Sequence, residues 1–498
     1  MKTEEKKVKE KSGEELFNTY LAPSLKDARK RITKDTNNIL FDINNDYKDM
    51  GKKIRDRQLS YMVKTYGCQG NLADSEKICG IMDALGYVEV NKEVLADVIF
   101  FNTCAIRENA ENRIYGELGR FKNLKKKNKD LLICLCGCMP QEEVTIQRIK
   151  ESYPQVDIVF GTHNIHMIPE YLYMAYKSNN NVVEVMSIEG DIVEGVPQKR
   201  VSNIKAWVDI MYGCDEFCTY CIVPYTRGKE RSRKPEAIIS EVEELVKLGY
   251  KEITLLGQNV NAYGKDFVER KYTFANLLED LAKTNIPRIR YTTSHPRDLD
   301  KETMDVMGKY PNIMPHLHLP VQSGSNVILK KMNRKYTKEM YLEKIEYLKK
   351  QVPGISLTTD IIVGFPYETD EDFEETLDLV RKADFEGAYT FIYSPRAGTP
   401  AATYEQIPES ISKPRLLKLN DLINEGFARG NKRFEHQWVE VLVDGYSDKD
   451  PSMLCGYTKH NKLVNFKGDD KLMGKFVNVY IEKAYSWHLR GTLEHEEK

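Results

Sequence analysis

The sequence lacks a long apolar run, a net charge and a cationic–apolar leader at its start. No run approaches the roughly 20 apolar residues of a membrane span, and the longest, 131–139, is typical of a buried strand. The 74 lysines and arginines nearly balance the 75 aspartates and glutamates, which leaves a net charge of −1 and a pI near 6.8. Nucleic acid could therefore be bound only by local patches. We expect no membrane association.

Ten cysteines occur in this chain without a recognisable signal sequence. Disulfides are rare in the reducing cytosol, where cysteines in such a pattern more often bind metal. We therefore expect a cytoplasmic, metal-binding protein. At 498 residues the chain is too long for one ordinary domain, so we expect two or three.

Three of the cysteines stand within eight residues, in the pattern C-x3-C-x2-C: Cys214, Cys218 and Cys221. Thiolates this close suit a soft metal or an iron–sulfur cluster. Three ligands leave one position of a four-iron cluster open, and an open position is where cofactor chemistry takes place. The alternatives are an incomplete zinc site or chance clustering, but no His or Cys follows at finger-like spacing. This stretch favours an enzyme.

The first 58 residues are rich in Lys, Glu and Asp, so we expect a charged extension that is disordered or forms a loosely docked helix, with an RNA contact as the less favoured interpretation. From residue 59 to 185, strand-like runs alternate with amphipathic segments. The runs are 60–66, 97–102, 131–136 and 156–160. This alternation predicts a doubly wound α/β domain with a parallel sheet.

Cys68, Cys104 and Cys138 each follow one of the first three predicted strands, at separations of 36 (68 to 104) and 34 (104 to 138) residues. Each separation fits one βαβ unit. The carboxyl ends of parallel strands converge on the crevice where such sheets bind ligands. A second three-cysteine cluster site is therefore predicted, against the alternative that these are small buried hydrophobes. Cys134 and Cys136 lie within the third strand, so we interpret them as core.

Residues 200–430 repeat a strand–helix unit six times, with strands at 206–212, 252–257, 288–294, 316–321, 355–363 and 387–394. Six units are too few for a closed eight-stranded barrel, so we predict an open, partial barrel with its chemistry at the carboxyl ends of the strands. Polar residues follow these ends, and each alone is typical of a hydrogen-bonded loop. Together with Tyr220 they are our candidate cofactor contacts: Gln258, Asn259, Ser294, His295, Gln322, Ser323, Asp360 and Tyr393.

Directly after the cysteine stretch comes a run of cations in which Arg227, Lys229, Arg231 and Arg233 are candidate RNA or substrate contacts, against the alternative of a solvated turn. From 431 to 495 the hydrophobic period changes to two, which predicts a small antiparallel β-barrel. Its aromatic residues are candidates for stacking on bases, although most should form its core.

The stretch from Gly213 to Gly228, GCDEFCTYCIVPYTRG, resembles the cluster loop of the radical S-adenosylmethionine (SAM) enzymes, and specifically their methylthiotransferase branch. TYGCQGN at 65–71, NTCAIR at 102–107 and GCMPQ at 137–141 are similar to that branch's auxiliary-cluster motifs. The resemblance runs from about residue 60 to the end. It implies a methylthiotransferase N-terminal domain, a radical-SAM partial barrel and a C-terminal TRAM domain.

Within the branch, RENAEN at 107–112, FGTH at 160–163 and LLGQNVN at 255–261 resemble the bacterial enzymes that act on isopentenylated adenosine in tRNA. The resemblance implies two 4Fe-4S clusters, with SAM bound at the open iron of the cluster on Cys214, Cys218 and Cys221. Reductive cleavage of SAM would yield a radical that activates C2 of the adenine. The cluster on Cys68, Cys104 and Cys138 would supply or receive the sulfur, which a second SAM methylates.

The implied substrate is the anticodon loop of tRNA, at the isopentenylated adenosine beside the anticodon. We expect a monomer that receives electrons from a donor such as flavodoxin or ferredoxin. The alternatives are the relatives that methylthiolate threonylcarbamoyl-adenosine of tRNA or a ribosomal protein. An alternative of another class is an RNA-binding protein with structural metal sites.

Overall fold

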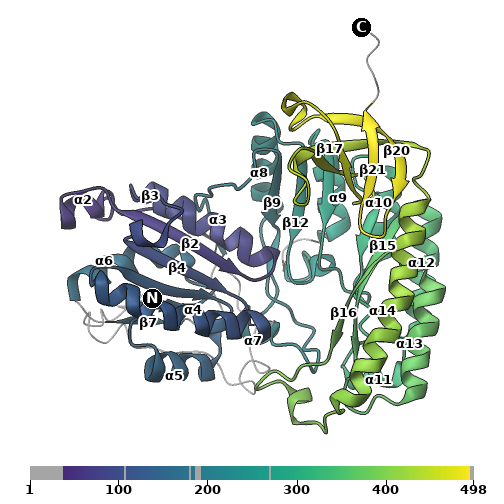
Figure 1. The fold of residues 1–498 in the computed structure, drawn as a ribbon, viewed down its shortest axis with the longest axis horizontal. Helices are drawn as coiled ribbons and strands as arrows, with labels where there is room; N and C mark the ends of the chain where they lie inside the picture. Colours follow the sequence, from purple (N-terminus) through teal and green to yellow (C-terminus); the bar gives the residue numbers. More distant parts are fainter. Residues whose placement is uncertain (1–37, 106–107, 179–180, 186–191, 269–270, 494–498) are drawn as a thin grey trace, which may run out of the picture. The chain divides into compact units, whose positions relative to one another are not determined.

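A computed structural model describes residues 38–105, 108–178, 181–185, 192–268 and 271–493 (Figure 1). The chain forms two compact units. The first comprises residues 1–201 together with 222–229, and the second comprises 202–221 together with 230–498. No helix in the described ranges is both long and apolar enough to cross a membrane.

The first unit is built on a six-stranded parallel sheet in the order β3-β2-β4-β5-β6-β7. Its strands are β2 (Ser60–Tyr66), β3 (Val88–Glu89), β4 (Val98–Thr103), β5 (Leu132–Gly137), β6 (Ile158–Phe160) and β7 (Val182–Glu184). The connecting helices are α3 (Gln69–Ala84), α4 (Glu108–Lys127), α5 (Glu143–Ser152) and α6 (Ile168–Ser178). The predicted α/β class is confirmed.

Alternating strand residues bury the two faces of this sheet against different helices. On β4, Phe100 packs in one hydrophobic cluster with residues of α3 and α6, and its neighbours Ile99 and Phe101 pack in another with residues of α4 and α5. The central strands β4 and β5 are buried at every position because both faces of the sheet are covered.

Within residues 38–58 of the charged extension the chain is folded, which favours the docked helix over disorder for this part. A parallel pair joins β1 (Asn38–Leu40) to β8 (Ile192–Glu194), and the short helix α2 (Met50–Arg55) follows. Met50 is 1% exposed and packs with the core of the sheet. A few apolar residues of this charged stretch therefore attach it to the sheet. The remainder, 1–37, lies outside the described residues.

The second unit contains the six predicted parallel strands, divided into two three-stranded sheets. One has the order β13-β12-β9 and the other β14-β15-β16, with isolated parallel bridges such as Ile289 to Ile313 nearby. The strands are β9 (Lys205–Asp209), β12 (Glu252–Leu256), β13 (Arg288–Tyr291), β14 (His316–His318), β15 (Ser356–Val363) and β16 (Ala388–Ile392). This is the open, partial barrel that the sequence predicted.

Helices cover the outside of these strands and share one hydrophobic cluster with them. They are α8 (Pro235–Lys247), α9 (Phe274–Ala282), α10 (Lys301–Lys309), α12 (Lys338–Gln351), α13 (Asp370–Ala383) and α14 (Glu409–Lys432), with the shorter α11 (Asn326–Lys331) among them. A two-stranded antiparallel pair, β10 (Met211–Tyr212) with β11 (Arg231–Ser232), brackets the cysteine stretch in sequence.

The C-terminal part of the second unit is a closed barrel in the order β17-β18-β19-β21-β20, coloured yellow-green to yellow in Figure 1. Its strands are β17 (Trp438–Tyr446), β18 (Leu454–Thr458), β19 (Leu463–Phe466), β20 (Phe476–Ala484) and β21 (Leu489–Leu493). Arg288 of β13 is 1% exposed and donates to the carbonyl of Tyr457 and the carboxylate of Glu440. A buried guanidinium thus ties the barrel to the strands of the same unit.

Candidate functional site

Three cysteines of the first unit lie at the carboxyl ends of three neighbouring strands. Cys68 follows β2 and is the N-cap of α3, Cys104 follows β4, and Cys138 follows β5. Because β2, β4 and β5 are adjacent in the sheet, these ends lie on one edge. Cys104 and Cys138 are buried, and Cys68 is partly exposed.

The backbone at Gly137 turns Cys138 toward this edge. Gly137 has φ +95°, and a Cβ there would lie 2.4 Å from the carbonyl oxygen of Thr103. That carbonyl accepts the hydrogen bond of the Cys138 N–H at 2.8 Å. Only glycine allows both this positive φ and the close approach of β4 to β5 at this point.

Two asparagines join the loops that carry Cys68 and Cys104. Asn71 is fully buried; its Oδ1 accepts from the Cys68 N–H at 3.2 Å, and its Nδ2 donates to Asn102 Oδ1 at 3.0 Å. Asn102 in turn donates to the Asn71 carbonyl at 2.7 Å. Reading the sequence did not single out this pair, although both residues stand in the quoted motifs.

The pKa values of two thiols at this edge shift in opposite directions. Burial raises the pKa of Cys138, although the charge of Arg227 opposes this effect. A hydrogen bond with Cys104, together with the charge of Arg227, lowers the pKa of Cys68 to about 5 against the opposing effect of burial. Burial raises the pKa of Cys134 and Cys136, which lie in the sheet core as expected. A thiolate favoured beside two further cysteines is the donor set that iron–sulfur clusters use, so the residues fit such a group.

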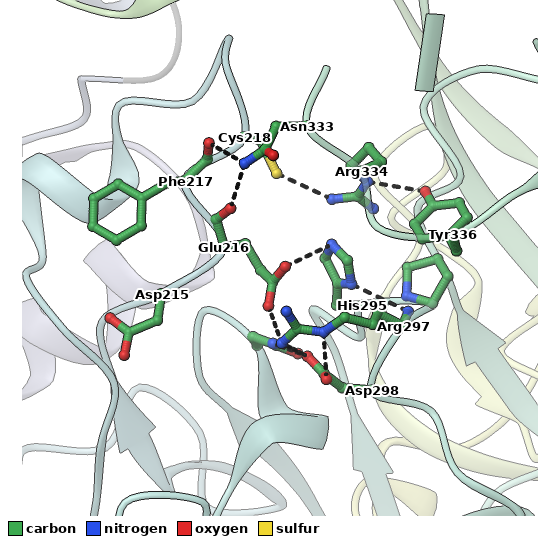
Figure 2. A network of polar contacts seen from close by, with 12 residues as sticks. Asp215, Glu216, Phe217, Cys218, His295, Arg297, Asp298, Asn333, Arg334 and Tyr336 are labelled. Atoms are coloured by element: carbon green, nitrogen blue, oxygen red, sulfur yellow. Dashed lines mark hydrogen bonds and ion pairs between the residues drawn. The ribbon is translucent and has the colours of Figure 1, made fainter. Parts of the chain in front are cut away.

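The cysteines of the second unit lie in the loop between β10 and the start of the segment 222–229. Cys218 is buried, and Cys214 and Cys221 are partly exposed. The Cys221 N–H donates to the Cys218 carbonyl at 3.0 Å, so these two cysteines stand on one turn of the loop. Asn333 donates to the carbonyls of Glu216 and Phe217 at 3.2 and 3.0 Å and so holds the loop between the first two cysteines (Figure 2).

A buried ionic network supports this loop (Figure 2). Glu216, 2% exposed, forms an ion pair with Arg297, and the Arg297 Nε lies 2.9 Å from Asp298. Lys265 also pairs with Asp298. His295 Nε2 lies 3.7 Å from the Glu216 carboxylate, and burial lowers the His295 pKa to about 2. Imidazole and carboxylates of this spacing can bind metal, but Arg297 and Lys265 already supply the cations.

Several predicted cofactor contacts present buried polar atoms beside this network. Asn259 Oδ1, Ser294 Oγ and His295 Nε2 are buried and have no hydrogen-bond partner within the described part of the chain. Unsatisfied buried polar atoms are costly, and ligands commonly satisfy them. Asn259 Nδ2 meanwhile donates to Asp298 Oδ2 at 2.7 Å, which fixes the side chain. These three residues fit a polar ligand such as SAM.

The other candidates have different surroundings. Gln258 Oε1 accepts from the Gly213 N–H at 2.5 Å, at the start of the cysteine loop. The partly exposed Asp360 lies 3.4 Å from His318, and its carbonyl accepts from the Gln322 N–H. Tyr220 and Tyr393 both pack on Phe365, and the buried Tyr393 hydroxyl has no hydrogen-bond partner in the described ranges.

Ser323 forms its hydrogen bonds with neighbouring residues of the chain. The residue is fully buried, its Oγ lies 3.4 Å from Thr376 Oγ1, and it accepts from the Ser325 N–H at 3.2 Å. Its place after a strand suggested a cofactor contact, but the hydroxyl is already used by the loop. We correct that assignment to a structural one.

Three of the four candidate RNA cations are buried, which contradicts their assignment as RNA contacts. Arg227, Arg231 and Arg233 are 7–8% exposed. Arg233 donates to the Asp209 carbonyl and to Glu241, and Arg227 pairs with Asp74. Charge spacing alone does not reveal which cations have partners distant in sequence. Lys229 is the more exposed member and remains a predicted contact.

Comparisons with known proteins agree with this architecture. The chain matches the Uncharacterized protein family UPF0004 over residues 60–161, the Radical SAM superfamily over 208–380 and the TRAM domain over 432–493. It is 54% identical over 476 residues to the tRNA-2-methylthio-N(6)-dimethylallyladenosine synthase of Bacillus licheniformis, covering 95% of this chain and 92% of that protein. The chain belongs to this synthase family. The Bacillus subtilis protein of the same name is 55% identical, with the same coverage.

A solved structure shares the fold at low sequence identity. The radical S-adenosylmethionine methyltransferase TsrM from Kitasatospora setae aligns with a TM-score of 0.50 and 14% identity, over 70% of this chain and 75% of that one. At this identity the likeness concerns the fold alone.

Proposed function

We propose that the protein is a radical-SAM tRNA methylthiotransferase, which adds a methylthio group to C2 of N6-isopentenyladenosine beside the anticodon. The observation that carries the proposal is the pair of cysteine trios: Cys68, Cys104 and Cys138 in the first unit, and Cys214, Cys218 and Cys221 in the second. Membership of the synthase family supports it.

The cysteines hold two 4Fe-4S clusters, one on each trio, and each trio leaves one cluster position without a protein ligand. When bound, the clusters and SAM supply the one-electron, sulfur and methyl chemistry that side chains cannot provide. The protein holds and orients these groups and excludes water from them. In the first unit, Gly137, Asn71 and Asn102 fix the loops on which the sulfurs stand.

In the second unit, Asn259, Ser294 and His295 are the proposed SAM contacts, because they combine burial with unsatisfied polar atoms. Burial and nearby cations keep His295 neutral. Its Nδ1 accepts from the Arg297 N–H at 3.2 Å, so Nε2 carries the ring proton and can donate a hydrogen bond. Gln258 orients the start of the cluster loop. Gln322, Asp360, Tyr220 and Tyr393 remain candidates from their positions after or within strands.

The C-terminal barrel is the proposed RNA-binding element, together with Lys229. Trp438 and Trp487 are 53% and 66% exposed, and Tyr446 and Tyr485 are 49% and 38% exposed. Exposed aromatic rings of this kind stack on unpaired bases. The substrate adenosine lies in a loop, so it can enter a pocket without the opening of a duplex.

Anaerobic reconstitution tests the proposal. Two four-iron clusters require about eight irons per chain, and reduction should cleave SAM. Bound zinc without cleavage would instead support an RNA-binding protein with structural metal sites.

Mass spectrometry of tRNA nucleosides from a complemented deletion strain separates the related substrates. The 2-methylthio derivative of isopentenyladenosine is expected. The corresponding threonylcarbamoyl-adenosine product, or methylthiolation of a ribosomal protein, would assign the chain to one of the other branches. We further propose a cytoplasmic monomer that takes electrons from a flavodoxin or ferredoxin.

A further inference from the structure

Arg227 is a buried cation at the cysteines of the first unit. It is the C-cap of the short helix α7 (Val223–Thr226), within the segment 222–229 that belongs to this unit. Its Nε–H donates to Cys138 Sγ at 3.3 Å, and its Nη2 pairs with Asp74 Oδ2 at 2.8 Å. A Cβ added at Gly70 would lie 3.6 Å from both the Arg227 Nη2 and Cys68 Sγ, so the guanidinium and this second sulfur both lie beside Gly70.

The surroundings hold this guanidinium in one orientation. Thr162 Oγ1 donates to the Thr226 carbonyl at 3.1 Å, and the Arg227 N–H donates to the Val223 carbonyl at 2.8 Å, which anchors the segment. Asp74 is 4% exposed, on the first turns of α3, the helix that Cys68 caps. A buried carboxylate and a buried guanidinium are stable together, whereas either one alone carries a large desolvation cost.

The contact places positive charge where a cluster would concentrate negative charge. Three cysteine thiolates and their sulfide-bridged iron carry charge that burial disfavours. Hydrogen bonds to ligand sulfurs, and nearby charge, are the means by which a protein sets the reduction potential of such a cluster. Arginine stays protonated in proteins, so its contribution persists at any working pH.

The second unit contains a comparable contact with different partners. Arg334, 8% exposed, has Nη1 at 3.5 Å from Cys218 Sγ. Its other nitrogens donate to the Tyr336 hydroxyl and the Pro320 carbonyl, both neutral groups. Each cysteine trio therefore has one buried arginine on one of its sulfurs, and that of the first unit is paired with a carboxylate.

We propose that Arg227, oriented by Asp74, is the positioning residue of the auxiliary cluster: its Nε–H fixes Cys138 and raises the cluster's reduction potential. This inference deepens the proposed function, because it requires a cluster on Cys68, Cys104 and Cys138. It also explains why Arg227, one cation of this basic run, is buried and does not serve as an RNA contact.

The test uses the full-length chain with Cys214, Cys218 and Cys221 replaced by alanine, so that only the auxiliary cluster assembles. Iron content, the electron paramagnetic resonance spectrum and the potential from a redox titration are compared for Arg227, Arg227→Met and Arg227→Lys. Lys229→Met removes the same charge two residues away, and Arg334→Met removes the arginine of the other trio. Both are matched controls.

We expect Arg227→Met to raise the ratio of oxidised to reduced cluster, at a given applied potential, by tenfold or more. For a one-electron couple, a tenfold change corresponds to a reduction potential lower by about 59 mV. Arg227→Lys should recover part of the shift, because it keeps the charge and loses the fixed Nε–H. Both controls should keep the starting potential and spectrum. If Arg227→Met loses iron while Arg227→Lys and Lys229→Met retain it, the positioning role is supported.

Potentials and spectra of Arg227→Met equal to those of Lys229→Met would overturn the inference, as would equal iron loss in Lys229→Met. Failure of the parent variant, with Arg227 intact, to assemble any iron–sulfur cluster would instead contradict the proposed function. The two failures are therefore distinguishable.

Discussion

Replacement of Gly137 by alanine should destabilise the auxiliary site by more than the conformational cost of a non-glycine residue at positive φ. A non-glycine residue at positive φ costs roughly 1–2 kcal/mol, and this cost applies at φ +95°. The new Cβ would also lie 2.4 Å from the Thr103 carbonyl oxygen, closer than any ordinary contact. Moving that carbonyl away sacrifices its 2.8 Å bond from the Cys138 N–H, which adds about 1 kcal/mol or more. We therefore expect a loss of about 3 kcal/mol.

Gly249 provides the matched control for this prediction. Its φ is +88°, and a Cβ there would meet no atom within 4 Å among the described residues. Gly249→Ala should therefore lose only about 1–2 kcal/mol, the conformational cost alone. The assay is denaturant unfolding of the full chain, with iron content of the auxiliary cluster measured in parallel. Equal destabilisation and equal iron content in the two variants would refute the reasoning.

Three further outcomes follow from the same structure. Asn71→Ala should lower the iron content of the auxiliary cluster and the free energy of unfolding by about 2–4 kcal/mol, because it leaves buried polar groups without a hydrogen-bond partner. Asn276→Ala, at an exposed helix cap, should leave the iron content unchanged. Equal iron content in the two variants would contradict the role of Asn71 in holding the Cys68 and Cys104 segments together. In equilibrium dialysis, Ser294→Ala should raise the Kd for SAM, whereas Ser323→Ala should not. A raised Kd for Ser323→Ala with an unchanged Kd for Ser294→Ala would instead make Ser323 the SAM contact. Burial lowers the pKa of His460 from 6.5 to about 4, so the unfolded chain binds the proton first as the pH falls. The His460 share of stability should thus be full above about pH 6.5 and about 2 kcal/mol lower at about pH 5. The pKa values of His295 and His316 are also lowered, so His460→Gln should make the fall in stability shallower by this share without abolishing it in unfolding measurements.

Much of the sheet in the first unit could be predicted because its signal is local. In the run 60–66, aromatic and β-branched residues alternate with polar ones and predict β2, and continuous apolar runs predict β4 and β5. The edge strands β3 and β7, two and three residues long, were missed because so short a segment has no detectable period.

The cysteine positions at strand ends were predictable from spacing, since each βαβ unit returns the chain to one edge of the sheet. The partners of those cysteines were not. Arg227 and Asp74 are 153 residues apart, and only the folded chain shows that they meet. The cation run therefore led to a prediction of exposure that burial overturned. Likewise, the Asn71–Asn102 pair depends on a contact between the first turn of α3 and the end of β4, which no local pattern encodes.

The central claim is that the two cysteine trios have separate tasks. The most direct measurement is mass spectrometry of tRNA nucleosides, together with SAM cleavage, for Cys68→Ala. Isopentenyladenosine should persist without a methylthio group while SAM is still cleaved at the site on Cys214, Cys218 and Cys221. Formation of the methylthio product by Cys68→Ala, or loss of SAM cleavage in this otherwise folded variant, would contradict the account.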